Sequence, residues 1–240
     1  MKAKIRIPFF EIGIKNYIYG DRVLELAQAA ETASLKYDID VLLICPYTEI
    51  RRVSECCKHL IVLAPYMDTL RPGRGMADVL PEAIKAAGAK GVVINHCERP
   101  MSLSAIKQTI DRANELQLLS FACANSIAEA RAIAQLCPDI INPEPTELIG
   151  TGTPSGMEYV TQTINAIKTV CDRIIVEQAA GITTSDQVYD FIMFGAEGIG
   201  MASGIFKAPD PAKMAEEAIS SVRRALNDRL KNSLNSKEEP

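Results

Sequence analysis

The chain has 240 residues, a formal net charge of −4 and an ordinary share of hydrophobic and charged side chains, which suits one large α/β domain or two small ones. The charge and the lack of a long basic block argue against nucleic acid as a partner, and no apolar run approaches membrane-spanning length. The N-terminus lacks the apolar core of a signal peptide, and the seven cysteines form no CxxC pair. We therefore expect a cytoplasmic protein with reduced thiols.

Short apolar, β-branched runs alternate along the whole chain with longer amphipathic stretches. The short runs predict eight strands, at residues 5–14, 40–45, 60–65, 91–95, 118–123, 139–142, 173–177 and 198–202. The amphipathic stretches predict helices between them, among them 22–36, 102–116, 127–136, 157–170 and 185–194. Strict alternation predicts parallel strands, and eight units in this length favour a single-domain (β/α)8 barrel over a doubly wound open sheet.

The domain boundary is expected near the C-terminus, where the composition becomes polar and charged. We assign residues 1–226 to the barrel, as its catalytic domain, and 227–240 to a polar tail. This tail is expected to be a frayed helix end or disordered, because it holds few apolar residues that a core could bury.

Polar side chains follow the predicted strands at their carboxyl ends, where barrels of this kind place their active sites. Side chains alternate along a strand, so Glu11, Gly13 and Lys15 share one face of the first strand. His96 follows the fourth strand and Glu144 the sixth. If their faces point inward, Lys15, His96 and Glu144 converge above the barrel.

These three residue types suit proton transfer between adjacent carbons of a hydroxy-ketone. Glu144 would be the carboxylate base, and His96 the donor that polarises the carbonyl and moves a proton between oxygens. Lys15 would attract a phosphate and stabilise the charge of an enediolate. A lone histidine at a strand end is more often structural, but the joint occurrence at five strand ends favours a site. Backbone N–H groups for a phosphate are expected at Gly150, Gly181, Ala202 and Ser203.

The motifs around these residues resemble those of the triosephosphate isomerase family, in particular its short archaeal form. The resemblance runs from about residue 8 to 210 and rests mainly on Asn95-His-Cys-Glu98 and on the stretch 144–152. It implies a TIM barrel that interconverts dihydroxyacetone phosphate and glyceraldehyde 3-phosphate in glycolysis and gluconeogenesis. It also implies a small phosphorylated sugar as substrate, no metal, no organic cofactor, no nucleic acid or membrane partner, and a homotetramer.

The resemblance also implies roles for the site residues. Lys15 matches the substrate-binding lysine, His96 the electrophile and Glu144 the base, while Glu98 matches a carboxylate that pairs with the lysine. Asn95 and Glu11 are expected behind the residues that touch the substrate.

Three positions depart from the family pattern. Gly13 stands where the family carries an asparagine that touches the substrate, and Ala179 replaces a glycine in the seventh loop. Glu11 stands where the short-form enzymes have a small apolar residue, and Lys15 is its nearest obvious partner. Two alternatives follow: an isomerase of a related sugar such as a tetrulose phosphate, or a paralogue that binds a sugar phosphate without catalysis.

Overall fold

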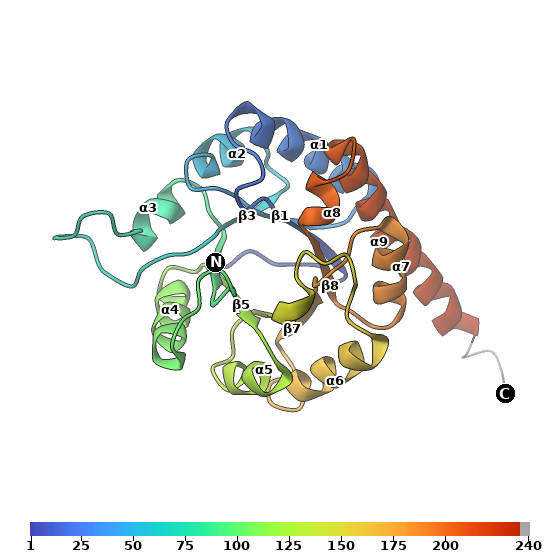
Figure 1. The fold of residues 1–240 in the computed structure, drawn as a ribbon. Helices are drawn as coiled ribbons and strands as arrows, with labels where there is room; N and C mark the ends of the chain where they lie inside the picture. Colours follow the sequence, from blue (N-terminus) through green and yellow to red (C-terminus); the bar gives the residue numbers. More distant parts are fainter. Residues whose placement is uncertain (236–240) are drawn as a thin grey trace.

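Eight parallel strands close into a barrel at the centre of the molecule and follow one another around the ring in chain order (Figure 1). The structure, a computed structural model, describes residues 1–235. Strand β8 pairs with β1 and closes the ring, so the fold is the predicted (β/α)8 barrel. The strands are β1 (Phe9–Gly13), β2 (Val41–Ile44), β3 (Ile61–Ala64), β4 (Gly91–Ile94), β5 (Leu119–Ala124), β6 (Ile140–Pro143), β7 (Ile175–Gln178) and β8 (Gly198–Met201).

Helices surround the barrel and pack on its outer face (Figure 1). Within residues 1–235, no helix is long and apolar enough to cross a membrane. The helices are α1 (Asp21–Tyr37), α2 (Ile50–Cys56), α3 (Pro81–Ala86), α4 (Leu103–Glu115), α5 (Ile127–Ala134), the 3₁₀ turn η1 (Thr146–Leu148), α6 (Met157–Lys168), α7 (Ser185–Met193), α8 (Ser203–Phe206) and α9 (Pro211–Asn235).

The predicted and observed elements differ mainly in their ends and in the short helices. The strand predicted for 5–14 begins only at Phe9, after Pro8, which has no N–H group to donate to a strand ladder. Helices α2 and α3 were not among the predicted ones, because 7 and 6 residues span at most two turns and show little periodicity. Helices α8 and α9 were also not among them.

Helix α9 continues past the expected domain boundary at residue 226. Its buried positions recur every three or four residues, and that face packs against α7 and α1. Residues 227–235, for which we expected a frayed helix end or disorder, continue this helix. The rest of the expected tail, 236–240, lies outside the described residues. The buried positions of α9 are Ala215, Ala218, Ile219, Ser221, Val222 and Ala225.

The inside of the barrel holds an apolar layer and, nearer the carboxyl ends of the strands, a polar one. The polar layer consists of Glu11, Asn142 and Glu177, all of them buried. It lies directly beneath the mouth of the barrel, so the site is built on a floor of polar groups. The apolar cluster consists of Phe9, Leu42, Ile61, Leu63, Val93, Leu119, Phe121, Cys123 and Ile140.

Two glycines of β8 make room for side chains of β1. In the barrel register, Phe9 lies opposite Gly198 and Glu11 opposite Gly200. A Cβ atom at Gly198 would overlap the ring of Phe9, and one at Gly200 would overlap Oε2 of Glu11. Strand β8 is therefore bare on its inner face because β1 fills the space in front of it.

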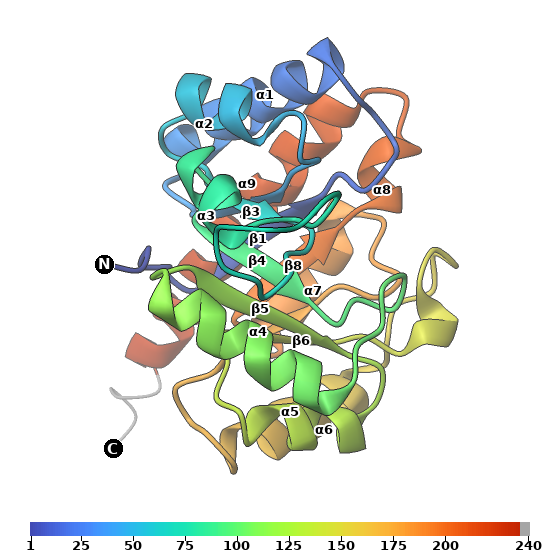
Figure 2. The same cartoon turned by 90° about the vertical axis from the view of Figure 1, so that its left-hand side faces the viewer.

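The two ends of the barrel carry different segments of the chain (Figure 2). The N-terminal segment lies at one end, and the loop that follows β6 projects from the other. Because all strands are parallel, that second end collects the loops that follow their carboxyl termini.

Candidate active site

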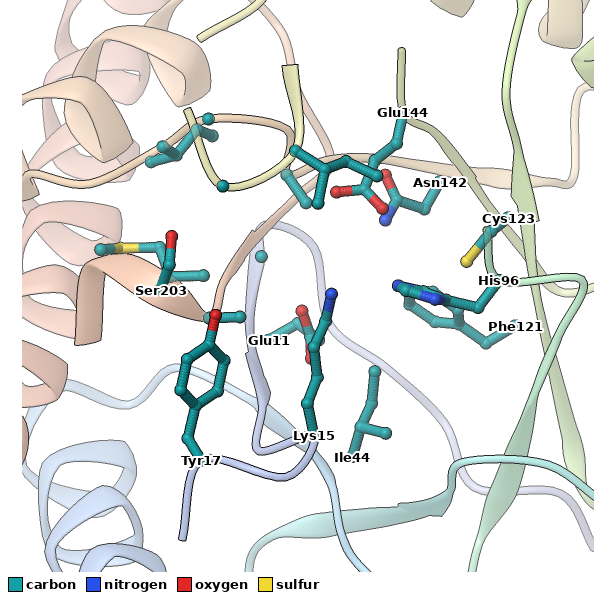
Figure 3. Close-up of a pocket in the computed structure, with 18 residues that line it drawn as sticks. Glu11, Lys15, Tyr17, Ile44, His96, Phe121, Cys123, Asn142, Glu144 and Ser203 are labelled. Atoms are coloured by element: carbon teal, nitrogen blue, oxygen red, sulfur yellow. The ribbon is translucent and has the colours of Figure 1, made fainter. Parts of the chain in front are cut away.

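A cavity opens among these loops, and the side chains of Lys15, His96 and Glu144 point into it (Figure 3). The predicted convergence of the three side chains is therefore present. Among the predicted site residues, Gly13, Asn95 and Glu98 do not line this cavity. Those that line it are Glu11, Lys15, His96, Glu144, Gly150, Gly181, Ala202 and Ser203.

Lys15 follows β1 in a left-handed backbone conformation, with φ at 47°. Its Nζ atom donates a hydrogen bond to Oε1 of Glu98 at 2.9 Å, so the expected Lys15–Glu98 pair is present. Burial lowers the pKa of Lys15, but the hydrogen bond and charge of Glu98 outweigh it and the pKa is raised. Lys15 is thus a cation at neutral pH.

Lys15, the nearest obvious partner of Glu11 along the chain, forms its ion pair with another carboxylate. Among the ion pairs within the described residues, Lys15 is joined to Glu98 and not to Glu11. The left-handed turn at Lys15 places its ammonium group within reach of the loop after β4 instead. Oε1 of Glu11 has no hydrogen-bond partner in this part of the chain.

His96 is held as a neutral imidazole with a defined tautomer. The backbone N–H of Glu98 donates to its Nδ1 atom at 3.1 Å, so Nδ1 acts as acceptor and the ring proton lies on Nε2. Burial and the charge of Lys15 lower the pKa of His96, and the charge of Glu98 opposes this only in part. The ring can therefore donate from Nε2 into the cavity without carrying a charge.

Asn95 fixes the turn that presents His96. Its backbone is left-handed, with φ at 60°, a conformation that asparagine tolerates better than most residues. Its Nδ2 atom donates to the carbonyl of Cys123 at 3.1 Å and to Glu129 at 3.0 Å, while Oδ1 accepts from the N–H of Met101 at 2.8 Å. The turn is thereby tied to β5, α5 and the following loop.

Glu144 comes directly after β6 and is half-buried. Its backbone N–H donates to the carbonyl of Ala124 at 2.8 Å, which fixes the strand end that carries it. Burial raises the pKa of this carboxyl to about 7, against the opposing charge of Lys15 and with support from Glu98. A base with this pKa is half ionised near neutral pH and can both take and return a proton.

The loop after Glu144 depends on glycine at two positions. Gly150 has φ at 74° and Gly152 at 79°, both in the left-handed region that favours glycine. Between them, Oγ1 of Thr151 donates to the carbonyl of Leu148 at 2.8 Å and accepts from the N–H of Thr153 at 3.0 Å. These hydrogen bonds make the loop a defined turn, and its residue Gly150 lines the cavity.

The wall on the far side from His96 is made by the loops after β7 and β8. Gly181, with φ at 73°, packs so closely on the carbonyl of Thr153 that a Cβ atom would overlap it. Ala202 and Ser203 stand at the start of α8, and Ser203 lies across the cavity from His96 (Figure 3). The glycine loop and the loop after β7 thus meet at one wall.

The sequence did not single out several residues of the site. Tyr17 lines the cavity and stacks on Phe206, with ring centroids 4.9 Å apart. Asn142 also lines it, and Glu177 lies beneath it, fully buried. Strand alternation places Asn142 on the same face as Glu144. Nothing in the sequence indicates which side of β7 faces inward, so the inward position of Glu177 could not be predicted.

Glu177 and Glu11 lie close together in the floor. Oε1 of Glu177 and Oε2 of Glu11 both lie within 3.4 Å of the place where a Cβ of Gly200 would stand. Neither oxygen of Glu177 has a hydrogen-bond partner among residues 1–235. Burial first, and then the charges of Glu11 and Glu144, raise the pKa of Glu177 well above its usual range. Nowhere in the described chain do three or more His, Cys, Asp or Glu side chains gather in a way that could hold a metal ion.

Replacing Glu177 with Gln should stabilise the protein increasingly as the pH rises. A carboxyl whose pKa is raised by folding holds more protons in the folded than in the unfolded chain, so stability falls as pH rises from its unfolded pKa of about 4.3 through the raised value. The amide does not ionise and avoids that loss. Urea unfolding of both proteins across this range should show a difference in the free energy of unfolding that widens with pH. A difference in the free energy of unfolding that does not change with pH would contradict the prediction.

Comparison with known proteins gives one consistent result. The family model described as triosephosphate isomerase matches residues 11–218, a range that includes all of the predicted site residues. The triosephosphate isomerase of Sulfurisphaera tokodaii is 37% identical over 225 residues, which cover 92% of this chain and 97% of that protein. That of Sulfolobus acidocaldarius is 34% identical over 227 residues, covering 92% and 98%. That of Methanocaldococcus jannaschii is 37% identical over 207 residues, covering 85% and 92%.

Proposed function

The chain belongs to the triosephosphate isomerase family, and from this premise we propose how its residues perform the reaction. The protein interconverts dihydroxyacetone phosphate and glyceraldehyde 3-phosphate. The names of the matching proteins favour this substrate over a tetrulose phosphate, and favour catalysis over sugar-phosphate binding alone.

Glu144 is the base in this proposal. Its carboxylate removes a proton from the carbon next to the carbonyl of the substrate and returns it to the neighbouring carbon, so the aldose and ketose exchange through an enediolate. The support is its place at the end of β6, its direction into the cavity and a pKa of about 7. A base of this strength is matched to proton transfer at neutral pH.

His96 and Lys15 stabilise the enediolate. The observation that carries this step is the bond from the backbone N–H of Glu98 to Nδ1 of His96, because it leaves Nε2–H as a neutral donor for the substrate oxygens. His96 moves a proton between the two oxygens as the double bond shifts. The ammonium group of Lys15 offsets the negative charge that develops there.

The phosphate group lies against the wall opposite His96. Backbone N–H groups of the loops at Gly150, Gly181, Ala202 and Ser203 are the proposed donors, and these residues line one cavity. The glycine turn after Glu144 then encloses the phosphate when substrate binds. This keeps water away from the enediolate.

The decisive experiment is exchange of carbon-bound hydrogen with solvent. The purified protein is mixed with dihydroxyacetone phosphate in deuterium oxide, and proton NMR follows the signals of the carbon that Glu144 deprotonates. We expect deuterium to enter at a rate set by the protein concentration, together with formation of glyceraldehyde 3-phosphate. A protein that binds the sugar phosphate without proton abstraction would produce neither change.

The reaction rate should depend on pH in a way set by Glu144. Because its pKa is about 7 and only the ionised form is a base, kcat/KM should rise with pH below 7 and level off above it. The phosphate of the substrate titrates near pH 6, so its own curve is recorded by phosphorus NMR and taken into account. A profile that follows the phosphate alone would contradict the assignment of Glu144.

We also propose that the protein is a cytoplasmic homotetramer, as the resemblance implies. In support, residues 65–80 form a long loop that extends away from the barrel, and Met76 on it is 94% exposed (Figure 1). An apolar side chain held out in this way suits contact with another subunit. All seven cysteines are free thiols, which suits a reducing compartment. Sedimentation velocity at several concentrations would distinguish a tetramer from a smaller assembly.

A further inference from the structure

The carboxyl group of Glu11 occupies the space beside Gly13 at the base of the cavity. Oε1 of Glu11 lies 3.2 Å from the position that a Cβ atom of residue 13 would take. Both residues lie on the inner face of β1, and Gly13 is where the family carries a substrate-touching asparagine. The carboxyl of Glu11, two residues deeper in the barrel, therefore lies where a side chain at residue 13 would extend.

The neighbouring strand is adapted to this placement. Glu11 pairs in register with Gly200, and any side chain at 200 would displace the Glu11 carboxyl. A Cβ there would also lie 3.0 Å from that of Ala179. Two glycines on different strands thus leave a slot of the size of one carboxyl group, with Glu11 in it.

Glu11 lines the cavity, and one oxygen of its carboxyl lacks a hydrogen-bond partner among residues 1–235. The residue is 5% exposed, and Oε1 makes no hydrogen bond within the described part of the chain. Figure 3 shows Glu11 among the side chains that line the cavity, together with Lys15, His96 and Glu144. Buried polar groups are normally satisfied, so a carboxyl without a partner in the wall of a cavity suggests that the ligand supplies one.

The surroundings of Glu11 favour its protonated form. It faces Glu177 from β7 and Glu144 from the end of β6, with Cys123 on β5 and Lys15 at the end of its own strand. Burial and the charge of Glu144 raise its pKa well above the usual range, and the attraction of Lys15 opposes this only in part. A neutral carboxyl can donate a hydrogen bond, which a carboxylate cannot.

We propose that Glu11 binds the substrate directly, donating a hydrogen bond from its carboxyl to an oxygen at the reacting end of the triose phosphate, in the place of the side chain absent at Gly13. The carboxyl of Glu177 lies close to that of Glu11, both beside Gly200. This inference rests on the proposed function and adds a residue to it.

Two replacements of Glu11 separate binding from space filling. Glu11→Met keeps the volume and loses the donor, so kcat/KM should fall by roughly 10²–10³-fold, as for the loss of one donor to a developing oxyanion. Glu11→Gln keeps a donor and should stay within a few-fold of the unchanged protein. If Glu11 only fills space, Glu11→Met is fully active, and that result overturns the proposal.

A double replacement tests the exchange of positions. Gly13→Asn alone should impair activity, because the new side chain meets Glu11 at 3.2 Å. Glu11→Gly combined with Gly13→Asn frees the slot and puts a donor at residue 13, so most of the lost kcat/KM should return. No recovery in a folded double variant, judged by circular dichroism and thermal unfolding, counts against the proposal.

Infrared difference spectroscopy gives a readout on the unaltered protein. Adding dihydroxyacetone phosphate should shift the carbonyl stretch of a protonated carboxyl, and Glu11→Gln should remove that band. A spectrum without the band, or with a band that substrate leaves in place, overturns the proposal. If the protein isomerises the substrate and exchanges deuterium normally but these tests fail, only the role of Glu11 is refuted. If there is no deuterium exchange, the proposed function itself is refuted.

Discussion

Replacing Glu144 with Gln is expected to lower kcat by roughly 10²–10⁴-fold while leaving the fold intact. The amide has nearly the same shape as the carboxyl but cannot accept a proton from carbon. The backbone N–H of Glu144, which holds the end of β6 to Ala124, is unaffected by the change. Steady-state kinetics in both directions, with circular dichroism as a check of folding, measures the effect.

Two further variants make this result specific. Glu144→Asp keeps the base but moves it back by one methylene, and a displacement of about 1 Å can cost roughly 10²-fold. The kcat of Glu144→Asp should therefore lie between that of the unchanged protein and that of Glu144→Gln. Glu158→Gln makes the same chemical change on an exposed surface and should leave kcat unaltered. Near-normal turnover in Glu144→Gln would remove Glu144 from the mechanism.

The second large effect is expected for Lys15→Met, which should lower kcat/KM by roughly 10²–10³-fold. Methionine keeps most of the length of lysine but has no charge to set against the enediolate. The charge of Lys15 also lowers the pKa of Glu144, so the rising limb of the pH profile should move to higher pH in this variant. A structural role for Lys15 would not move that limb.

The matched control for Lys15→Met is Lys107→Met. Lys107 forms an ion pair with Asp111 on the exposed face of α4, so this variant also breaks a lysine–carboxylate pair, but far from the cavity. Exposed pairs of this kind contribute little, about 0–1 kcal/mol. If both variants lose activity equally, the loss cannot come from the charge at the site.

The eight strands could be predicted because each is mostly apolar, as a parallel sheet covered on both faces requires. The long helices α1, α4, α6 and α7 could be predicted for a similar reason, since several turns repeat the same apolar face. Helices α2 and α3 are too short to repeat it. Their positions depend on contacts with the barrel, which the sequence does not state.

The site could be predicted where its residues stand at strand ends. Lys15, His96 and Glu144 share that property, and the parallel barrel brings them together without further information. The surroundings of Glu11 could not be predicted from its neighbours along the chain. Its neighbour Glu177 lies far away in the sequence and becomes adjacent only when β7, β8 and β1 close the ring.

The fit between β1 and the bare inner face of β8 limits the order in which substitutions can accumulate. A carboxyl side chain at residue 11 requires glycine at 200 and a minimal residue at 13, so those two openings had to exist before Glu11 could enter without overlap. While Glu11 is present, neither residue 13 nor residue 200 can gain a side chain without crowding its carboxyl. Among relatives, an acidic residue at the position of Glu11 should therefore occur together with glycine at the positions of Gly13 and Gly200. This should hold although Gly200 is nearly two hundred residues from Glu11 along the chain.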